Sequence, residues 1–365
     1  MTYSKLPGMY FSETISANPG LFEQTRAPLF IVQTSTTIAT IDDQITHYTG
    51  IDAFKSIVEG KGLTQTVKYM EDTLLEEGRT EFYVYSIKTD TATAFTNAIK
   101  GTAHLEDITS VVYVEETKSA TTNTIIQKIA AIKAGLDDNA ENGVFRIAYV
   151  VPLGTVEDAV DNAASGTSAE SACITSLTTI LSGTGNGRIC VPLPDENAGI
   201  IIGKCLATRY DEEPGFTGVY TSPAQSTYNF DHTQMITLQN LGVLFLRNES
   251  LNGINTYRIN LGVTTSFKAS AADGLIVKRT TADEVLREIK QAGIAYVKAK
   301  ETATSLAGLK NEVSRVITEF ADEESIDKKE TKLTVSDGGN NTFYITGTIM
   351  PTGSVIAIEV QTTLA

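Results

Sequence analysis

Phe145-Arg146-Ile147-Ala148-Tyr149-Val150-Val151-Pro152 is an almost uninterrupted apolar run that ends at a proline. A run of this kind is typical of a strand that is covered on both faces. Shorter runs with strand composition occupy residues 29–32, 82–87, 111–114 and 188–192, and segments with helical spacing lie at 66–75, 123–134, 156–164 and 170–181. Strands that alternate with helices predict a layered α/β domain, which we assign to residues 24–235.

The pattern changes after residue 235. Residues 243–247 and 257–261 have strand composition, and two helices are expected at 283–298 and 306–320. Asp283 and Glu284 would lie in the first turn of the earlier helix, where acidic side chains suit the helix dipole. Residues 332–335 and 342–346 flank a glycine turn and predict a β-hairpin. We therefore expect a smaller α+β domain over residues 236–350.

Each end of the chain carries an expected arm with an extended β-strand. The N-terminal arm, residues 1–23, combines a strand at 8–14 with an irregular linker at 15–23. The C-terminal arm, residues 351–365, contains an expected strand whose alternate residues form one strongly apolar face. Such a strand invites aggregation if it stays unpaired, so it pairs either with its own sheet or with the sheet of another subunit. The pattern alone favours neither, although two arms raise the chance of exchange between subunits.

Charge and reactive residues exclude several classes of function. Lys+Arg 29 against Asp+Glu 44 gives a net charge of −15, which repels phosphate groups and argues against nucleic acid or a membrane surface as partner. No apolar run reaches the roughly 18 residues of a membrane helix. The 3 Cys and 3 His lack metal-ligand spacing, so we expect neither a metal nor a cofactor. We expect the cysteines to be small buried residues.

Two glycine clusters partly match phosphate-binding loops. Residues 199–205 resemble the end of a P-loop, but the interior is apolar and Cys205 replaces the hydroxyl residue that binds magnesium. Helical spacing favours a helix packed on a sheet. Residues 182–187 follow a helix and precede a strand, the reverse of a dinucleotide-binding order, and are interpreted as a helix cap and turn. A nucleotide-binding α/β enzyme remains the alternative function.

Four segments together resemble a known family. Pro7-Gly8-Met9-Tyr10-Phe11-Ser12-Glu13 comes first, and residues 67–85 combine a helix, Gly78 and an apolar strand. Residues 198–224 end in Tyr220-Thr221-Ser222-Pro223-Ala224, and Gly347-Thr348-Ile349-Met350-Pro351 precedes the apolar tail. In this order and spacing they resemble the tail sheath proteins of contractile phages and of related injection systems such as R-type bacteriocins.

The resemblance implies a structural protein and no enzyme activity. Such a subunit polymerises into a helical tube of stacked hexameric rings around an inner tail tube, and contraction drives that tube through a target envelope. Expected partners are further copies of the chain, the inner tail tube protein, and the baseplate and tail terminator proteins. Assembly is expected in the cytoplasm of the producing cell, as part of a virion tail or injection particle.

The resemblance also implies roles for particular segments. The arms would be donated to neighbours, the hairpin would accept them, and the C-terminal domain would face the inner tube through one of its two helices, unless both helices only cover the small sheet. The expected arm residues are Met9, Tyr10, Phe11, Glu13, Val355, Ile356, Ile358 and Val360. The expected residues of the accepting hairpin are Leu333, Val335, Phe343 and Ile345, and those of the tube-facing helix are Asp283, Glu284, Arg287 and Lys290.

Overall fold

The computed structural model describes residues 27–352, apart from residues 35–37, 39–40, 89, 119–123, 184, 216–217, 252–253, 269–273, 297–301 and 339–342. Most of the two predicted arms, including all eight expected arm residues, lies outside the described residues. In the part that is described, no helix is long and apolar enough to cross a membrane.

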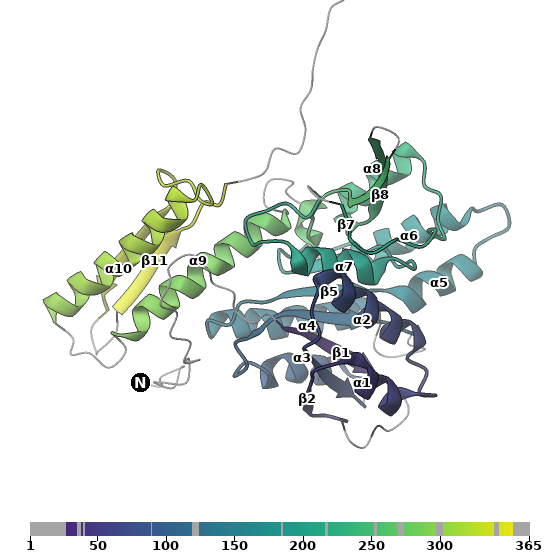
Figure 1. Ribbon diagram of the computed structural model, residues 1–365, viewed down its shortest axis with the longest axis horizontal. Helices are drawn as coiled ribbons and strands as arrows, with labels where there is room; N and C mark the ends of the chain where they lie inside the picture. Colours follow the sequence, from purple (N-terminus) through teal and green to yellow (C-terminus); the bar gives the residue numbers. More distant parts are fainter. Residues whose placement is uncertain are drawn as a thin grey trace, which may run out of the picture.

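A seven-stranded sheet in the order β2-β3-β1-β4-β5-β6-β7 organises the chain (Figure 1). Neighbouring strands are parallel except β2, which runs antiparallel to β3. The central part of the predicted run at 145–152 forms β5 near the middle of the sheet. All five residues of β5 are buried. The strands are β1 (Ala27–Gln33), β2 (Ile45–Tyr48), β3 (Phe82–Ile87), β4 (Ile108–Val114), β5 (Ile147–Val151), β6 (Ile189–Pro192) and β7 (Val243–Leu244).

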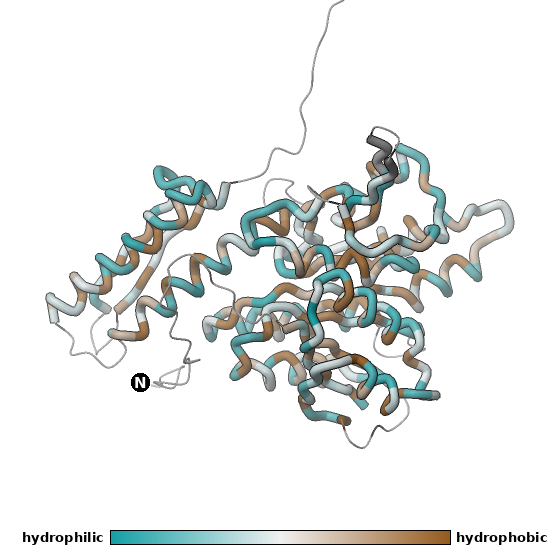
Figure 2. Tube along the Cα trace, in the orientation of Figure 1, coloured by the Kyte–Doolittle hydropathy of each residue, from teal (hydrophilic) through white to brown (hydrophobic). Residues whose placement is uncertain are grey.

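Helices cover both faces of this sheet, as the near-continuous apolar strands predict. Along β5, Tyr149 packs with Tyr69 and Ile201 on one face, whereas Val150 packs with Ile132 and other residues on the opposite face. Figure 2 shows the hydrophobic residues concentrated between the layers. The first face carries α1 (Ile51–Val58), α2 (Thr64–Glu77) and α7 (Ala198–Ala207), the second carries α3 (Ala92–Gly101), α4 (Ile125–Glu141), α6 (Ala169–Leu181) and α8 (His232–Leu241), and α5 (Leu153–Asp161) follows β5.

The sheet continues past residue 235, where the sequence analysis placed the end of the α/β domain, because β7 pairs with β6. The expected strand at 243–247 is divided between β7 and β8 (Leu246–Leu251). β8 pairs with β9 (Ile254–Ile259) in a separate two-stranded sheet, and a short 3-10 helix, η1 (Thr265–Lys268), follows.

The last elements form a unit that extends away from the layered body (Figure 1). It consists of α9 (Ile276–Ile294), α10 (Ala303–Asp322), β10 (Lys332–Asp337) and β11 (Phe343–Thr348), and we call it the C-terminal unit. α9 begins at Ile276, seven residues before the expected start at Asp283. Asp283 and Glu284 therefore lie inside α9 and not in its first turn, so the helix-dipole interpretation was wrong.

Two glycines allow α2 and α7 to approach each other closely. A Cβ atom at Gly199 would lie 2.6 Å from the carbonyl oxygen of Tyr69, and one at Gly203 would lie 2.5 Å from that of Thr73. Real Cβ atoms do not come so close to backbone, so these positions require glycine. The prediction that residues 199–205 form a helix packed on the sheet is thereby confirmed.

We expect Gly203→Ala to lower the free energy of unfolding by about 1–3 kcal/mol, because the added methyl group must force two helices apart. Gly101→Ala is the matched control, since no atom lies within 4 Å of its added Cβ in α3. It should be neutral or stabilising, by about 0.5–1 kcal/mol. Urea unfolding followed by circular dichroism measures both; equal effects would contradict the packing argument.

Candidate functional site

The predicted hairpin is present as β10 and β11, which pair antiparallel from Lys332 opposite Thr348 to Asp337 opposite Phe343. Leu333, Val335 and Ile345 turn toward α9 and α10, where they join a cluster that includes Val313 and Phe320. Phe343 also packs on this cluster. The four predicted hairpin residues thus hold the hairpin on the helices through their side chains.

The outer edges of the hairpin remain available for pairing. In the described part of the chain, β10 and β11 form a sheet of two strands only, so each has one edge without a neighbouring strand. A strand edge of this kind presents unpaired N–H and C=O groups, which are a template for another strand. The outer face is exposed as well, and Tyr344 is 54% exposed on it.

Backbone contacts hold the described residues that follow β11 in place. Asp327 donates its backbone N–H to the carbonyl oxygen of Met350 at 2.8 Å, and Thr352 donates its own to the carbonyl oxygen of Ser325 at 3.0 Å. Ile326 and Pro351 form an isolated β-bridge at the same place. The expected C-terminal arm therefore starts from a fixed point at the base of the hairpin.

A buried ion cluster joins α9 to the layered body. Arg188, which precedes β6, donates to both carboxylate oxygens of Asp283, at 2.6 and 2.9 Å. Arg279 donates from Nε to Asp283 at 3.0 Å. Asp283 is only 2% exposed. A buried carboxylate needs such partners, because an uncompensated charge in the interior is strongly unfavourable.

The other residues of the expected tube-facing set continue this contact. Glu284 is buried and pairs with Arg287 at 2.5 Å. Arg287 also donates to the carbonyl oxygen of Phe145 at 2.7 Å, and Lys290 pairs with Glu106 at 2.9 Å. The four side chains predicted to face a tube are therefore engaged within their own chain, mostly with the layered body. Sequence reasoning missed this because no local pattern links α9 to residues 106, 145 and 188.

A second set of contacts holds the far end of α10 to the body. Arg209 and Tyr210 both donate to Glu323, at 3.0 and 2.9 Å, and Ser325 donates to Asp211 at 2.9 Å. The rings of Tyr210 and Phe320 lie 5.8 Å apart. With the Asp283 cluster, these contacts attach the C-terminal unit to the body at two separate places.

The three cysteines and the glycine-rich segment at 182–187 are parts of the fold. All three cysteines are buried and free, as predicted. Residues 182–187 follow α6, and Gly183 adopts a positive φ of 82° in the turn. Among the described residues, no group of His, Cys, Asp and Glu could hold a metal ion.

We expect Asp283→Ala to lower the free energy of unfolding by about 3–5 kcal/mol, because it leaves the buried Arg188 without its carboxylate. Asp158→Ala is the matched control: Asp158 pairs with Lys118 at the surface, where loss of an ion pair costs at most about 1 kcal/mol. Urea unfolding measures both variants. A small loss for Asp283→Ala would show that the cluster does not anchor α9.

Glu288 of α9 should make the free energy of unfolding depend on pH. Burial, and then the nearby Glu284, raise the pKa of this carboxyl group from 4.5 to about 7, although Arg315 opposes the shift. The folded chain thus binds more protons than the unfolded chain between these values, so its stability falls as the pH rises through this window. At pH 8, Glu288→Gln should be more stable than the wild type by about 1–2 kcal/mol, after allowance for partial solvent screening. The difference should vanish near pH 4, and an exposed control, Glu59→Gln, should show none.

Three solved structures align with this chain over nearly its whole length. The chain aligns with one in the baseplate of the anti-feeding prophage, with a TM-score of 0.63, 14% identity and 100% of both chains covered. The helical sheath of the anti-feeding prophage in its contracted state gives 0.63, 14% and 99% of both chains. The contracted PVC sheath complex of an extracellular contractile injection system gives 0.62 and 14%, over 100% of this chain and 98% of the other. No protein-family profile and no curated protein matches the sequence. The chain therefore has the fold of contractile injection system sheaths, and the resemblance drawn from its sequence motifs is confirmed at the level of the fold.

Proposed function

We propose that this chain is the structural subunit of a contractile tail sheath. The observation that carries the proposal is the extent of the structural likeness, which covers at least 98% of each contracted sheath chain and therefore includes the C-terminal unit. On this proposal the subunits form stacked hexameric rings in a helical tube around an inner tail tube. Contraction drives that tube through a target envelope.

The physical requirement is a lattice that stays connected while its subunits move. Donated strands meet it, because backbone hydrogen bonds to a sheet edge do not depend on the identity of the side chains. The open edges of β10 and β11 are suited to receive the arms at 8–14 and 355–361. The linker at 15–23 would then take up the movement between neighbouring subunits, while the doubly attached C-terminal unit moves with its own body.

The surface that faces the inner tube is better assigned to α10 than to α9. Three of the four expected α9 residues, Asp283, Arg287 and Lys290, are engaged by the layered body. On α10, Lys310 and Arg315 are exposed, and Arg315 pairs with Glu312 and Glu319 of its own helix. The helical form of the proposed tube follows from symmetry, because a head-to-tail contact that does not close generates a helical filament.

Further partners on this proposal are the baseplate and tail terminator proteins, and assembly takes place in the cytoplasm of the producing cell.

The test is assembly of truncated chains. The full chain should form rings or tubes in negative-stain electron microscopy, and deletion of residues 1–20 or 355–365 should abolish them while circular dichroism and the unfolding midpoint stay unchanged. Ile358→Pro should act like the deletion, because proline removes a backbone donor from the strand. Ile358→Thr keeps that donor and should still assemble.

Normal tubes from the truncated chains would overturn arm exchange. A full chain that forms neither rings nor tubes under any assembly condition would overturn the sheath proposal itself.

A further inference from the structure

A segment without helix or strand passes from one helical layer of the body to the other. Residues 218–229, which we call the strap, belong to the connection between α7 and α8, and the structure describes all of them. The strap begins at α2, where Glu76 accepts from the backbone N–H of Tyr220 at 2.8 Å. It ends at α6, where Glu170 accepts from the backbone N–H of Asn229 at 3.1 Å. Because α2 and α6 cover opposite faces of the sheet, the strap joins the two layers.

Side chains of the body hold the strap between these two ends. Asn197, which precedes α7, binds Ala224 twice: its Nδ2 donates to the carbonyl oxygen at 3.2 Å, and its Oδ1 accepts from the N–H at 2.9 Å. Asp195 accepts from the hydroxyl group of Ser226 at 2.7 Å. The strap is thus fixed by a row of polar contacts that follow one another along a single continuous segment.

The strap contributes little to the hydrophobic core. Of its residues only Tyr228 is buried, and the others are partly or fully exposed. Tyr228 shares a side-chain hydrogen bond with Cys173 of α6. Thr227 and Tyr228 also line a hollow of about 410 Å³, so the packing beneath this end of the strap is incomplete. Segments with few buried apolar contacts and an exposed backbone open at a lower free energy than the core of a protein.

We propose that the strap opens as one unit while the layered body stays folded, and that the opening uncovers Tyr228 and Cys173. The sheet and its helices are held by buried apolar side chains that the strap does not supply, so they can persist without it. The device would let the chain change part of its surface without deforming the body. The inference concerns a single chain and does not rest on the proposed function.

Cys173 is a natural reporter for this opening. Cys173 and Cys190 are both 0% exposed, so a difference between their reaction rates with a thiol reagent measures opening and not static exposure. Trypsin cleaves after Arg188, which places the two cysteines in different peptides.

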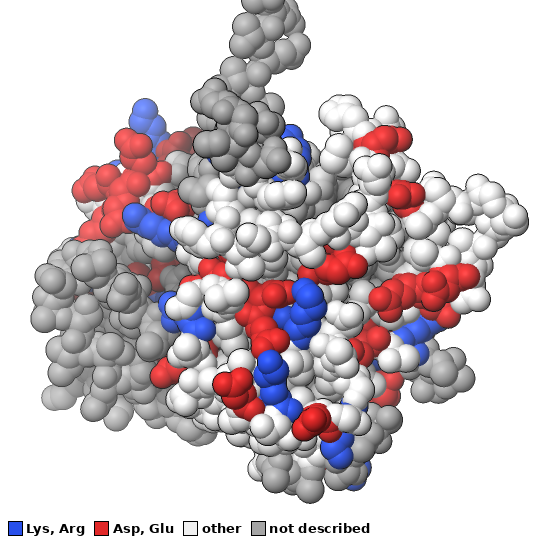
Figure 3. Space-filling view, turned by 45° about the vertical axis from the view of Figure 1, so that its right-hand side comes forward, with Lys and Arg blue, Asp and Glu red and all other residues white. Residues whose placement is uncertain are grey.

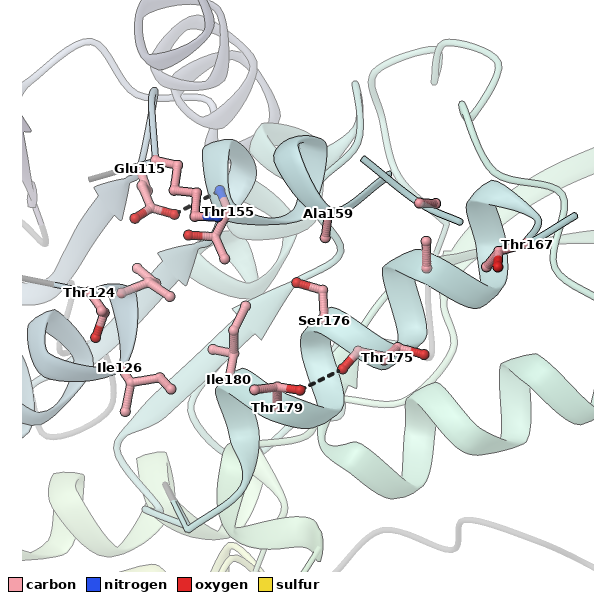
Figure 4. A pocket seen from close by; sticks show the side chains of 14 residues that line it. Glu115, Thr124, Ile126, Thr155, Ala159, Thr167, Thr175, Ser176, Thr179 and Ile180 are labelled. Atoms are coloured by element: carbon pink, nitrogen blue, oxygen red, sulfur yellow. Dashed lines mark hydrogen bonds between the residues drawn. The ribbon is translucent and has the colours of Figure 1, made fainter. Parts of the chain in front are cut away.

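The other side of α6 offers no competing route to this reporter. A hollow of about 610 Å³ lies there, lined by side chains that include Ala159, Ser176 and Ile180 (Figure 4). No strap residue and no cysteine is among the described residues that line it.

The first experiment is pulse labelling of the full chain with N-ethylmaleimide in native buffer, read by mass spectrometry of tryptic peptides. Cys173 should react at least tenfold faster than Cys190. Asn197→Ala should raise the ratio of the two rates about tenfold further, because it removes both hydrogen bonds to Ala224. Asn197 makes no side-chain hydrogen bond to the start of α7, so the change does not remove a helix cap.

Asn142→Ala is the matched control. The Asn142 side chain donates to the carbonyl oxygen of Asp138 within its own helix, at 2.9 Å, so its loss should leave the ratio unchanged. Equal rates for Cys173 and Cys190, in the wild type or in Asn197→Ala, would overturn the proposal, since they would mean that both thiols are exposed only when the whole chain unfolds.

Hydrogen exchange tests whether the strap opens as one unit. Ser226→Ala removes the contact with Asp195, and it should also speed exchange of the Tyr220 and Thr221 N–H groups about fivefold, although Glu76 holds these groups at the other end. Ser182→Ala, which removes a hydrogen bond at the end of α6, should leave them unchanged. Faster exchange confined to the residues next to 226 would show fraying at one anchor and would overturn the cooperative opening.

Discussion

One buried carboxylate holds the middle of α9, and with it the C-terminal unit, against the layered body. Asp283 lies between the guanidinium groups of Arg188 and Arg279, and Arg188 leads directly into the sheet. The contact fixes the middle of α9 against the body, while residues further along α9, such as Ile289, pack against α10. α10 in turn carries the hairpin. The direction in which the open strand edges point therefore depends in part on these buried charges, which lie on α9 and not on the hairpin.

Other carboxylates act in a similar way elsewhere in the chain. Glu116 accepts from the backbone N–H groups of Gln65 and Thr66 and so completes the start of α2. Glu76 holds the loop at residues 220–221, and Glu213 accepts from the backbone of Gly262. Acidic residues are also prominent on the face shown in Figure 3. The net charge of −15 is thus partly structural, because several acidic side chains hold separate segments together.

On the proposed function, these anchored loops and helices would give the subunit the rigidity that a sheath needs. The layered body and the C-terminal unit are joined by buried charges at α9 and by the contacts of Tyr210 and Glu323 at the end of α10. In the proposed lattice, movement would be concentrated between such bodies. The free energy of contraction would then be released as displacement of whole subunits and not as deformation of each one.

The periodic spacing of apolar residues was enough to predict the layered α/β body, the helix at Gly199 and Gly203, and the final hairpin, because each depends on side chains that are close together along the chain. The roles of α9 residues were not predictable in this way. Asp283 and Glu284 have the same local pattern whether they stabilise a helix start or a buried ion cluster, and only folding brings Arg188 to Asp283. The same holds for Glu115, which is brought to the backbone N–H of Thr155 in α5 only in the folded chain. Local sequence specifies which segments become helices and strands, whereas the partners of a charged side chain depend on long-range contacts that the assembled layers alone create.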